Sequence, residues 1–239
     1  MTPPPRLTIL FDNEPGLPAL TRLWGFAALI RVGDRTVLFD TGSHGRVLLK
    51  NMAALGLSAE SLDLLFLSHP HWDHIGGWDS VLELNPRLTV VVHEGFSKHL
   101  IRDLRGLCGD LIVVGADPRP LAPGLFSTGM LDSNPPEHAL VIDTVEVTAA
   151  ISGCAHPGME RIVERGVGLL GKSVDWAIGG FHLMDADPVR IEQSVRNLKA
   201  LGVTGVVPTH CTGDAGKAAF RRAFGAACLD GGVGRDIGA

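Results

Sequence analysis

Four side chains of the types that bind metal ions lie close together in the chain, at His69, His71, Asp73 and His74. They directly follow the apolar residues 64–67, which predict a buried strand. Residues two apart point the same way in an extended chain, so His69 and His71 can converge on one ion. The turn at Asp73 and His74 changes the chain direction and provides two further ligands. The spacing of these four residues suits two neighbouring metals. Without ions such a cluster would lack polar partners beside an apolar strand, so we interpret it as a metal site rather than a solvated loop.

The elements that must position this cluster are strands, which recur along both halves of the chain. Apolar and β-branched segments are separated by Gly, Pro or Asp, a pattern typical of buried strands. The expected strands are residues 7–12, 26–32, 36–39, 64–68, 88–92, 111–114, 139–142, 145–151, 174–178 and 203–207. Their number and distribution predict two sheets.

Helices are expected between these strands, and the clearest one starts at Asp187 as N-cap with Pro188 in the first turn. Apolar residues then recur at helical spacing up to Gly202, which predicts a helix that packs on a sheet. Further helices are expected at residues 45–55, 95–104, 157–170 and 214–224. No linker or short repeat divides the chain, so we predict a single α/β domain over residues 1–239, with helices outside two sheets.

Composition limits the classes of function. The chain has 239 residues, 45% of them hydrophobic and 20% charged, with a net charge of -5. It lacks a basic run that could neutralise a nucleic acid, and no apolar stretch approaches the length of a bilayer span. Its four cysteines form no C-x-x-C pair, which favours a reducing cytoplasm over a disulfide scaffold. We therefore expect a cytoplasmic protein that acts on a small molecule, with neither nucleic acid nor membrane as a partner.

The His-x-His-x-Asp-His segment at residues 69–74 resembles the hallmark loop of the metallo-β-lactamase superfamily. The resemblance implies a four-layer αβ/βα sandwich of two mixed sheets, with the metals at the edge between the sheets. It also implies that Asp40, in Phe39-Asp40-Thr41-Gly42, orients the metal loop without being a ligand. A simple Asp-Thr-Gly turn is the alternative explanation of that segment.

The resemblance also implies two ligands from the second half of the chain. His156 would complete the first site with His69 and His71, and His210 would join Asp73 and His74 at the second site. Cys154 and Cys211 each lie beside one of these histidines. They could be soft metal ligands, but small buried packing residues are the favoured interpretation.

One departure from the superfamily pattern concerns the ligand that bridges two metals. Most hydrolases of the superfamily place an Asp after a Gly at the end of a strand, whereas this chain has Gly179-Gly180-Phe181-His182-Leu183. The second metal would then be weakly bound, absent, or held partly by His182. His182 is accordingly a candidate either for metal binding or for substrate contact.

The motifs around His156, His182 and His210 resemble one branch of the superfamily, that of 7,8-dihydropterin-6-methyl-4-(β-D-ribofuranosyl)aminobenzene 5'-phosphate synthase. Pro70 and Trp72 depart from the best-known pattern of that branch without removing a ligand. Membership of a branch does not guarantee its named reaction.

Three functions follow as hypotheses. The first is hydrolysis of a small ester or phosphoester by a metal-activated water, with Asp73 as the catalytic group that positions the nucleophile. The second is the pterin-related transfer, in which metals hold a phosphate leaving group while an aromatic amine displaces it. For a flat substrate Trp72, Phe181 and Trp78 are candidate pocket walls. The third is metal binding without turnover. Zinc is the favoured ion, with one or two equivalents, and manganese and iron are alternatives.

Overall fold

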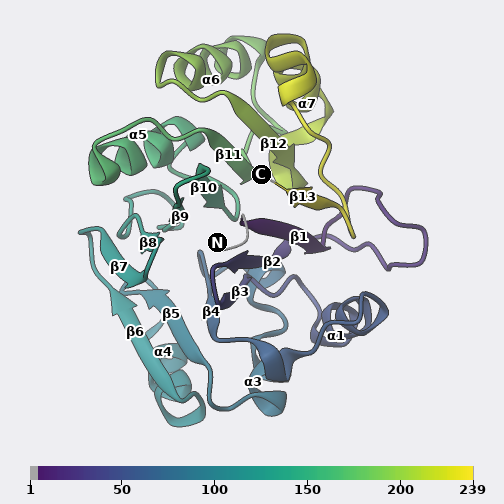
Figure 1. Ribbon diagram of the computed structural model, residues 1–239, viewed down its shortest axis with the longest axis vertical. Helices are drawn as coiled ribbons and strands as arrows, with labels where there is room; N and C mark the ends of the chain where they lie inside the picture. The colour runs from purple at the N-terminus through teal and green to yellow at the C-terminus, as the bar shows by residue number, and fades with distance from the viewer. Residues whose placement is uncertain (1–4, 239) are drawn as a thin grey trace.

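Two sheets packed face to face form the centre of the protein, and helices cover the outer face of each (Figure 1). The computed structural model describes residues 5–238. The layers run helix, sheet, sheet, helix, which confirms the predicted four-layer α/β sandwich.

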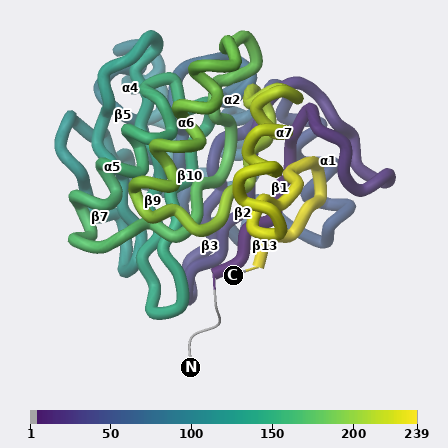
Figure 2. Tube along the Cα trace, turned by 90° about the horizontal axis from the view of Figure 1, so that it is seen from above, coloured from purple at the N-terminus to yellow at the C-terminus, as the bar shows by residue number. Residues whose placement is uncertain are grey.

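The first sheet has seven strands, in the order β13-β1-β2-β3-β4-β5-β6. The pairs from β13 to β3 are antiparallel, and those from β3 to β6 are parallel, so the sheet is mixed. Its strands are β1 (Arg6–Phe11), β2 (Ala27–Val32), β3 (Arg35–Phe39), β4 (Leu64–Phe66), β5 (Thr89–His93), β6 (Asp110–Val114) and β13 (Asp236–Gly238). Figure 2 shows the C-terminal segment against the N-terminal strand, where β13 pairs with β1.

The second sheet has six strands, in the order β12-β11-β10-β9-β8-β7. The strands β10, β11 and β12 are parallel, and the remaining pairs are antiparallel. Its strands are β7 (Arg119–Ala122), β8 (Leu125–Ser127), β9 (Leu140–Asp143), β10 (Thr148–Ser152), β11 (Trp176–Gly180) and β12 (Gly205–Thr209). The sequence did not predict the short strands β7, β8 and β13.

Alternation along the strands divides the core into three apolar layers. On β2, Ala28 and Ile30 face the second sheet, whereas Ala27 and Leu29 face the helices. The middle layer contains residues of both sheets, and each outer layer joins one sheet to its helices. Consequently both sheets are buried on both faces, which explains their nearly continuous apolar runs.

The helices α1 (Gly45–Ala54), α3 (Trp78–Leu84) and α4 (Lys98–Leu107) cover the first sheet. The helices α5 (Met159–Leu170), α6 (Pro188–Ala200) and α7 (Gly213–Phe224) cover the second. Asp187 caps α6 by accepting a hydrogen bond from the Arg190 amide, as predicted. The short helix α2 (Trp72–Ile75) and α3 were not predicted, because the first lies inside the histidine cluster and the second is only two turns long.

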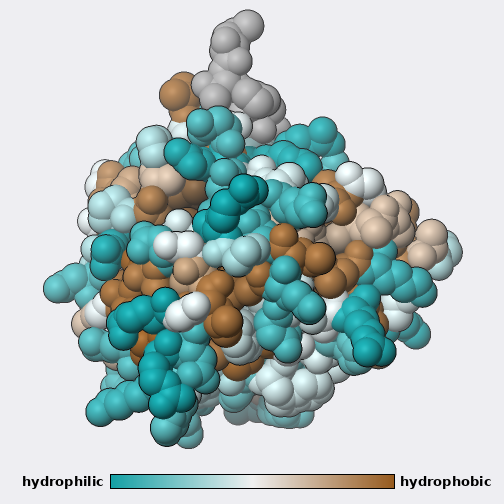
Figure 3. All heavy atoms as spheres, turned by 90° about the horizontal axis from the view of Figure 1, so that it is seen from below, coloured by the Kyte–Doolittle hydropathy of each residue, from teal (hydrophilic) through white to brown (hydrophobic). Residues whose placement is uncertain are grey.

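The face seen in Figure 3 is hydrophilic at its margins, and apolar side chains gather in a band across its middle. Single exposed apolar residues also occur, such as the half-exposed Leu84 and Leu107 at the ends of α3 and α4. Isolated residues of this kind are ordinary on protein surfaces. Within residues 5–238, no helix has both the length and the apolar character needed to span a membrane.

Candidate metal centre

Six of the residues expected to bind metal lie in two adjacent groups of three. In the first group, the ligand atoms of His69, His71 and His156 lie within 4.8 Å of one another. In the second group, those of Asp73, His74 and His210 meet the same limit. We call these groups the first and second triads.

The triads form where strands of both sheets end. His69 and His71 follow β4, and His71 is the N-cap of α2, whose single turn carries Asp73 and His74. The other two histidines come from the second sheet: His156 lies in the loop after β10, and His210 follows β12 in the 3-10 turn η2 (His210–Thr212). Each triad therefore needs residues from both halves of the chain.

The imidazole rings are packed closely around the junction of the two triads, in tilted and edge-to-face pairs. The ring centroids of His69 and His74, from different triads, are 4.2 Å apart, and those of His69 and His156 are 4.6 Å apart. In the second triad, the Nε2 atoms of His74 and His210 face each other at 3.2 Å.

In the first triad, hydrogen bonds at Nδ1 of His69 and His156 leave their Nε2 atoms free to bind a metal. His156 Nδ1 donates to the Glu137 carboxylate at 2.8 Å. His69 Nδ1 lies 2.9 Å from Ser68 Oγ, whose own hydroxyl donates to Asp40. Ser68 Oγ therefore accepts from His69, and the proton of each ring is placed on Nδ1.

The same arrangement recurs in the second triad. His74 Nδ1 lies 2.7 Å from Asp40 Oδ2, and His210 Nδ1 donates to Asn13 Oδ1 at 2.6 Å. Asp40 also accepts hydrogen bonds from the Ser68 amide and hydroxyl. One buried carboxylate thus joins the two triads, the orienting position expected for Asp40.

The donor set fits a divalent metal. The Nε2 atoms of His69 and His156 are buried and have no hydrogen-bond partner. A buried polar atom without a partner is costly, and a metal ion between these atoms would satisfy both. Imidazole and carboxylate ligands suit zinc, manganese and iron.

Burial keeps two of these imidazoles in the neutral form that ligates metals. It lowers the pKa of His69 and of His74 well below the ordinary histidine value. Burial also lowers the pKa of His210, but Asp73, Cys211 and Asp12 together outweigh burial, and the net shift of this pKa is upward. The pKa of Asp73 is held below its usual value. Burial alone would raise this pKa, but hydrogen bonds and nearby histidine charges, those of His210 first, more than offset burial.

Glu137 is a central group of the site that the sequence did not reveal. Its Oε1 accepts the backbone N–H groups of Gly153, Cys154 and Ala155, each at 3.0 Å, and its Oε2 accepts that of His156. Burial alone would raise the pKa of Glu137, but His69 and His156 lower it well below the usual range. The buried carboxylate therefore fixes both the loop after β10 and its histidine.

Backbone strain is concentrated at this site. Among the described residues, the non-glycine positions with positive φ are Asp40, Ala155, His182 and His210, with φ between 50° and 57°. Each ends a strand or lies beside a triad member. Left-handed conformations of such residues persist only where the surroundings enforce them, as they commonly do at functional sites.

His182 is exposed and lies beside the first triad. Its ring centroid is 4.5 Å from that of His156, and its ligand atom lies within 4.8 Å of those of Cys154 and His156. The neighbouring Cys211 raises the pKa of His182. A pocket of about 330 Å³ opens beside it, lined by Trp24, His182, Met184, Asp185, Ala186 and Cys211.

The three rings expected as pocket walls lie outside this pocket. Phe181 is 1% exposed and packs against Phe220 in the core, because the alternation at the end of β11 turns it away from the pocket. Trp78 packs in the layer between the first sheet and its helices, and Trp72 is 64% exposed and does not line the pocket. Trp24 lines it instead, with its ring centroid 5.0 Å from that of His210.

The site residues that sequence analysis did not identify differ in whether any sequence pattern marks them. Asn13 follows the buried strand β1 together with Asp12, and polar residues at a strand end are a usable signal. Glu137 and Trp24 lie in loops without a recognisable motif, so no local pattern marks them.

Fold and site together define a metal-dependent enzyme of the αβ/βα class. A family model described as "Metallo-beta-lactamase superfamily" matches residues 21–210, and the chain belongs to that superfamily.

The chain is also similar to individual proteins. It is 30% identical to 7,8-dihydropterin-6-methyl-4-(beta-D-ribofuranosyl)-aminobenzene-5'-phosphate synthase from Methanocaldococcus jannaschii, over 84% of each chain. The crystal structure of Tm1679, a metal-dependent hydrolase of the beta-lactamase superfamily, matches with 25% identity and a TM-score of 0.80, over 98% of this chain and 99% of that one. YhfI from Bacillus subtilis, a metallo-beta-lactamase fold protein, shares the fold at 19% identity and a TM-score of 0.71, over 98% and 99% of the two chains.

Proposed function

We propose that the protein is a metal-dependent hydrolase that acts on a small-molecule ester or phosphoester. The observation that carries the proposal is the common orientation of four imidazoles. His69, His74, His156 and His210 are each held at Nδ1 by a neighbouring oxygen, so each offers Nε2 to the space between the triads. The superfamily usually binds divalent metals, and these histidines with His71 and Asp73 are the proposed ligands.

A divalent ion held by neutral imidazoles would lower the pKa of a bound water towards neutrality. Asp73 is the proposed catalytic carboxylate. Its Oδ2 lies 3.4 Å from His210 Nε2 and 3.7 Å from His74 Nε2, and its lowered pKa keeps it ionised at neutral pH. It can therefore accept a hydrogen bond from the attacking water and hold the water in line with the substrate.

The pocket beside His182 is the proposed substrate site. Trp24, Met184 and Ala186 give it apolar walls, whereas His182 and Asp185 supply polar groups. This composition suits a small molecule with a flat ring. None of the lining residues is Lys or Arg, so the charge of a phosphate group would have to be balanced by the metals and His182.

The pterin-related transferase is the second candidate, and the similarity to the Methanocaldococcus jannaschii synthase favours it. In that reaction the nitrogen of an aromatic amine would form a bond to a pterin methylene carbon. The bond from that carbon to a phosphate oxygen would break, and the amine would release a proton. The rings of the substrates would stack against the apolar pocket walls, which would also exclude water.

The test uses untagged protein with its bound metals counted by inductively coupled plasma mass spectrometry. Leaving-group release is measured from bis(p-nitrophenyl) phosphate, from p-nitrophenyl esters, and from a dihydropterin methyl diphosphate with and without the ribofuranosylaminobenzene phosphate. Release without the amine supports the hydrolase, and release that requires the amine, with a coupled product of matching mass, supports the transferase. A fully metallated protein that is inactive on all of these substrates contradicts both.

A further inference from the structure

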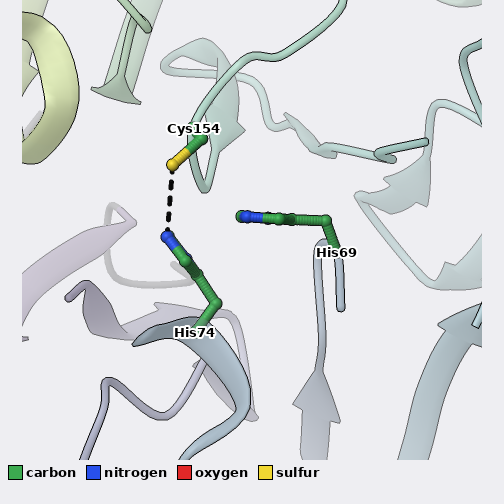
Figure 4. Close-up of side chains that lie close together, drawn as sticks. All are labelled: His69, His74 and Cys154. Atoms are coloured by element: carbon green, nitrogen blue, oxygen red, sulfur yellow. Dashed lines mark hydrogen bonds between the residues drawn. The ribbon is translucent and has the colours of Figure 1, made fainter. Parts of the chain in front are cut away.

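A thiol lies between the two triads. Cys154 Sγ is 3.3 Å from His74 Nε2, and its side chain points toward His74, with the His69 ring beside them (Figure 4). The ligand atoms of Cys154, His69 and His74 all lie within 4.8 Å of one another, so the sulfur lies close to one histidine of each triad. Cys154 is 4% exposed, and both histidines are fully buried.

The same sulfur belongs to each of the other groups at this site that combine cysteine with histidine. It is within the same limit of His156 and His182 on one side, and of His210 and Cys211 on the other. The sulfur therefore lies where an ion in either triad could reach it.

The three buried carboxylates at the triads, those of Glu137, Asp40 and Asp73, are already engaged. Both oxygens of Glu137 accept backbone and imidazole N–H groups, and those of Asp40 accept from Ser68 and His74. Asp73 already belongs to the second triad. Two divalent ions close together repel each other, and an anion between them reduces that repulsion. The Cys154 thiol, which lies beside a histidine of each triad, can become such an anion.

The end of β11 cannot supply a bridging side chain either. A Cβ atom added at Gly180 would lie 2.5 Å from the Gly153 carbonyl oxygen, 2.7 Å from Cys211 Sγ and 3.1 Å from the Cys154 Cα. The two cysteines and the backbone of the loop after β10 thus fill the space that a side chain at position 180 would need.

The Cys154 backbone is fixed before any metal binds, because its amide donates to Glu137 Oε1. The adjacent Gly153 packs so closely on the first triad that an added Cβ would lie 2.2 Å from Ser68 Oγ and 3.1 Å from His69 Nδ1. The sulfur is therefore presented to the triads by a rigid loop, as a preorganised ligand requires.

We propose that Cys154 is a metal ligand shared by the two triads, a bridging thiolate in a site whose other anionic ligand is Asp73. The proposal rests on the proposed metal site. When the ions bind, the S–H bond breaks, its proton is released to solvent, and the sulfur lone pairs form the bonds to metal. Unpartnered Nε2 atoms of His69 and His156 converge on the same space, as an independent indication of a ligand there.

The test is absorption spectroscopy of the full chain loaded with Co²⁺ under a phosphine reductant. Thiolate ligation gives an intense sulfur-to-cobalt charge-transfer band in the near ultraviolet, and the histidine sites give weaker visible bands whether or not sulfur is bound. We expect both in the wild type. Cys154→Ser should lose the charge-transfer band, keep visible bands, and bind its second metal equivalent at least about tenfold more weakly.

Two cysteine controls separate this role from others. Cys108 lies at the end of α4, away from the site, so the Cys108→Ser variant should keep the charge-transfer band. Cys211→Ser should also keep it, because Cys211 Sγ is engaged with the Cys154 carbonyl oxygen at 3.5 Å. Loss of the band in Cys211→Ser but not in Cys154→Ser would overturn the proposal, and so would a wild type with visible bands alone.

Cys154→Asp keeps the result interpretable if the serine variant folds poorly. A carboxylate can also bridge two ions, so this variant should bind two equivalents without the charge-transfer band. If it binds only one while circular dichroism shows a native fold, the bridging role is wrong. Absence of every cobalt band in the wild type would instead refute the metal site itself.

Discussion

The Glu137 carboxylate bonds both to the His156 ring and to the His156 backbone, through Oε2 at 2.8 Å and 2.9 Å. Its other oxygen accepts three consecutive amides of the same loop. One buried side chain therefore sets the position of the loop and the proton of its histidine.

Glu137→Gln is expected to destabilise the protein by roughly 3 kcal/mol, because the amide loses the charge and half of the acceptor capacity that five N–H groups share. Metal affinity of the first triad should fall by about 10–100-fold. Denaturant unfolding and metal titration check the two effects. Glu164→Gln, an exposed change on α5, is the control and should change neither. Wild-type metal affinity in a folded Glu137→Gln protein would refute the positioning role.

His71→Ala and His156→Ala are each expected to remove the metal of the first triad and to abolish turnover, since each deletes one of its three ligands. Bound metal counted after dialysis should fall by one equivalent. His99→Ala, on the exposed side of α4, should retain full metal content and activity. An active, fully metallated His156→Ala protein would invalidate the ligand assignment.

Asn13→Ala tests the second triad separately. Asn13 accepts the His210 Nδ1 proton and also donates to the His210 carbonyl at 3.2 Å. Without it, the second metal equivalent should bind about 10–100-fold more weakly, and the first should be unchanged. Asn13→Asp keeps the acceptor and should restore most of the affinity. Equal weakening of both equivalents would contradict the division into two triads.

Trp24→Ala should raise KM by about tenfold for a substrate with an aromatic ring and change kcat little, because the ring lines the pocket and the substitution leaves all six proposed metal ligands in place. Steady-state kinetics measure the split. Leu23→Ala, the neighbouring change outside the pocket lining, should leave KM unaltered. His182→Ala is expected to act on KM as well; unchanged metal content and turnover would remove its proposed role at the site.

Stability at acid pH should depend on His138, which is not a triad member. His138 Nε2 donates to the Leu67 carbonyl at 2.8 Å, and burial lowers the pKa of the imidazole to about 3. The folded value lies below the unfolded 6.5, so this stabilisation is complete above about pH 6.5 and is lost as the pH falls towards 3. Between pH 7 and pH 5 the loss is about 2 kcal/mol.

The measurement is denaturant unfolding of the apoprotein at both pH values. The apoprotein is used because metal ligands titrate in the same range. His138→Asn should make the difference between pH 7 and pH 5 smaller by about 2 kcal/mol, and the exposed His99→Asn should not. An undiminished difference in His138→Asn would assign the acid sensitivity to other groups.

The sequence predicted the principal strands, the two sheets and the helix from Pro188 because each has a local signal: an apolar run, a cap, or a stripe at helical spacing. The edge strand β7 has no such run, since Arg119 and Pro120 are exposed. The triad residues were predicted from one compact motif and a resemblance. Glu137 was not, because its role comes from backbone amides that only the folded loop directs at one carboxylate. Phe181 was misplaced for a similar reason: its side depends on how β11 ends, which the sequence does not encode locally.

The candidate ligands come from loops after β4, β10 and β12, which lie in different sheets. An ion bound in the second triad would act as a cross-link between segments as distant in the chain as His74 and His210. Because the site is complete only after the two sheets have docked, metal binding would be a late event in folding and would hold the halves together. Chelation should then loosen the contact between the sheets before it melts either of them.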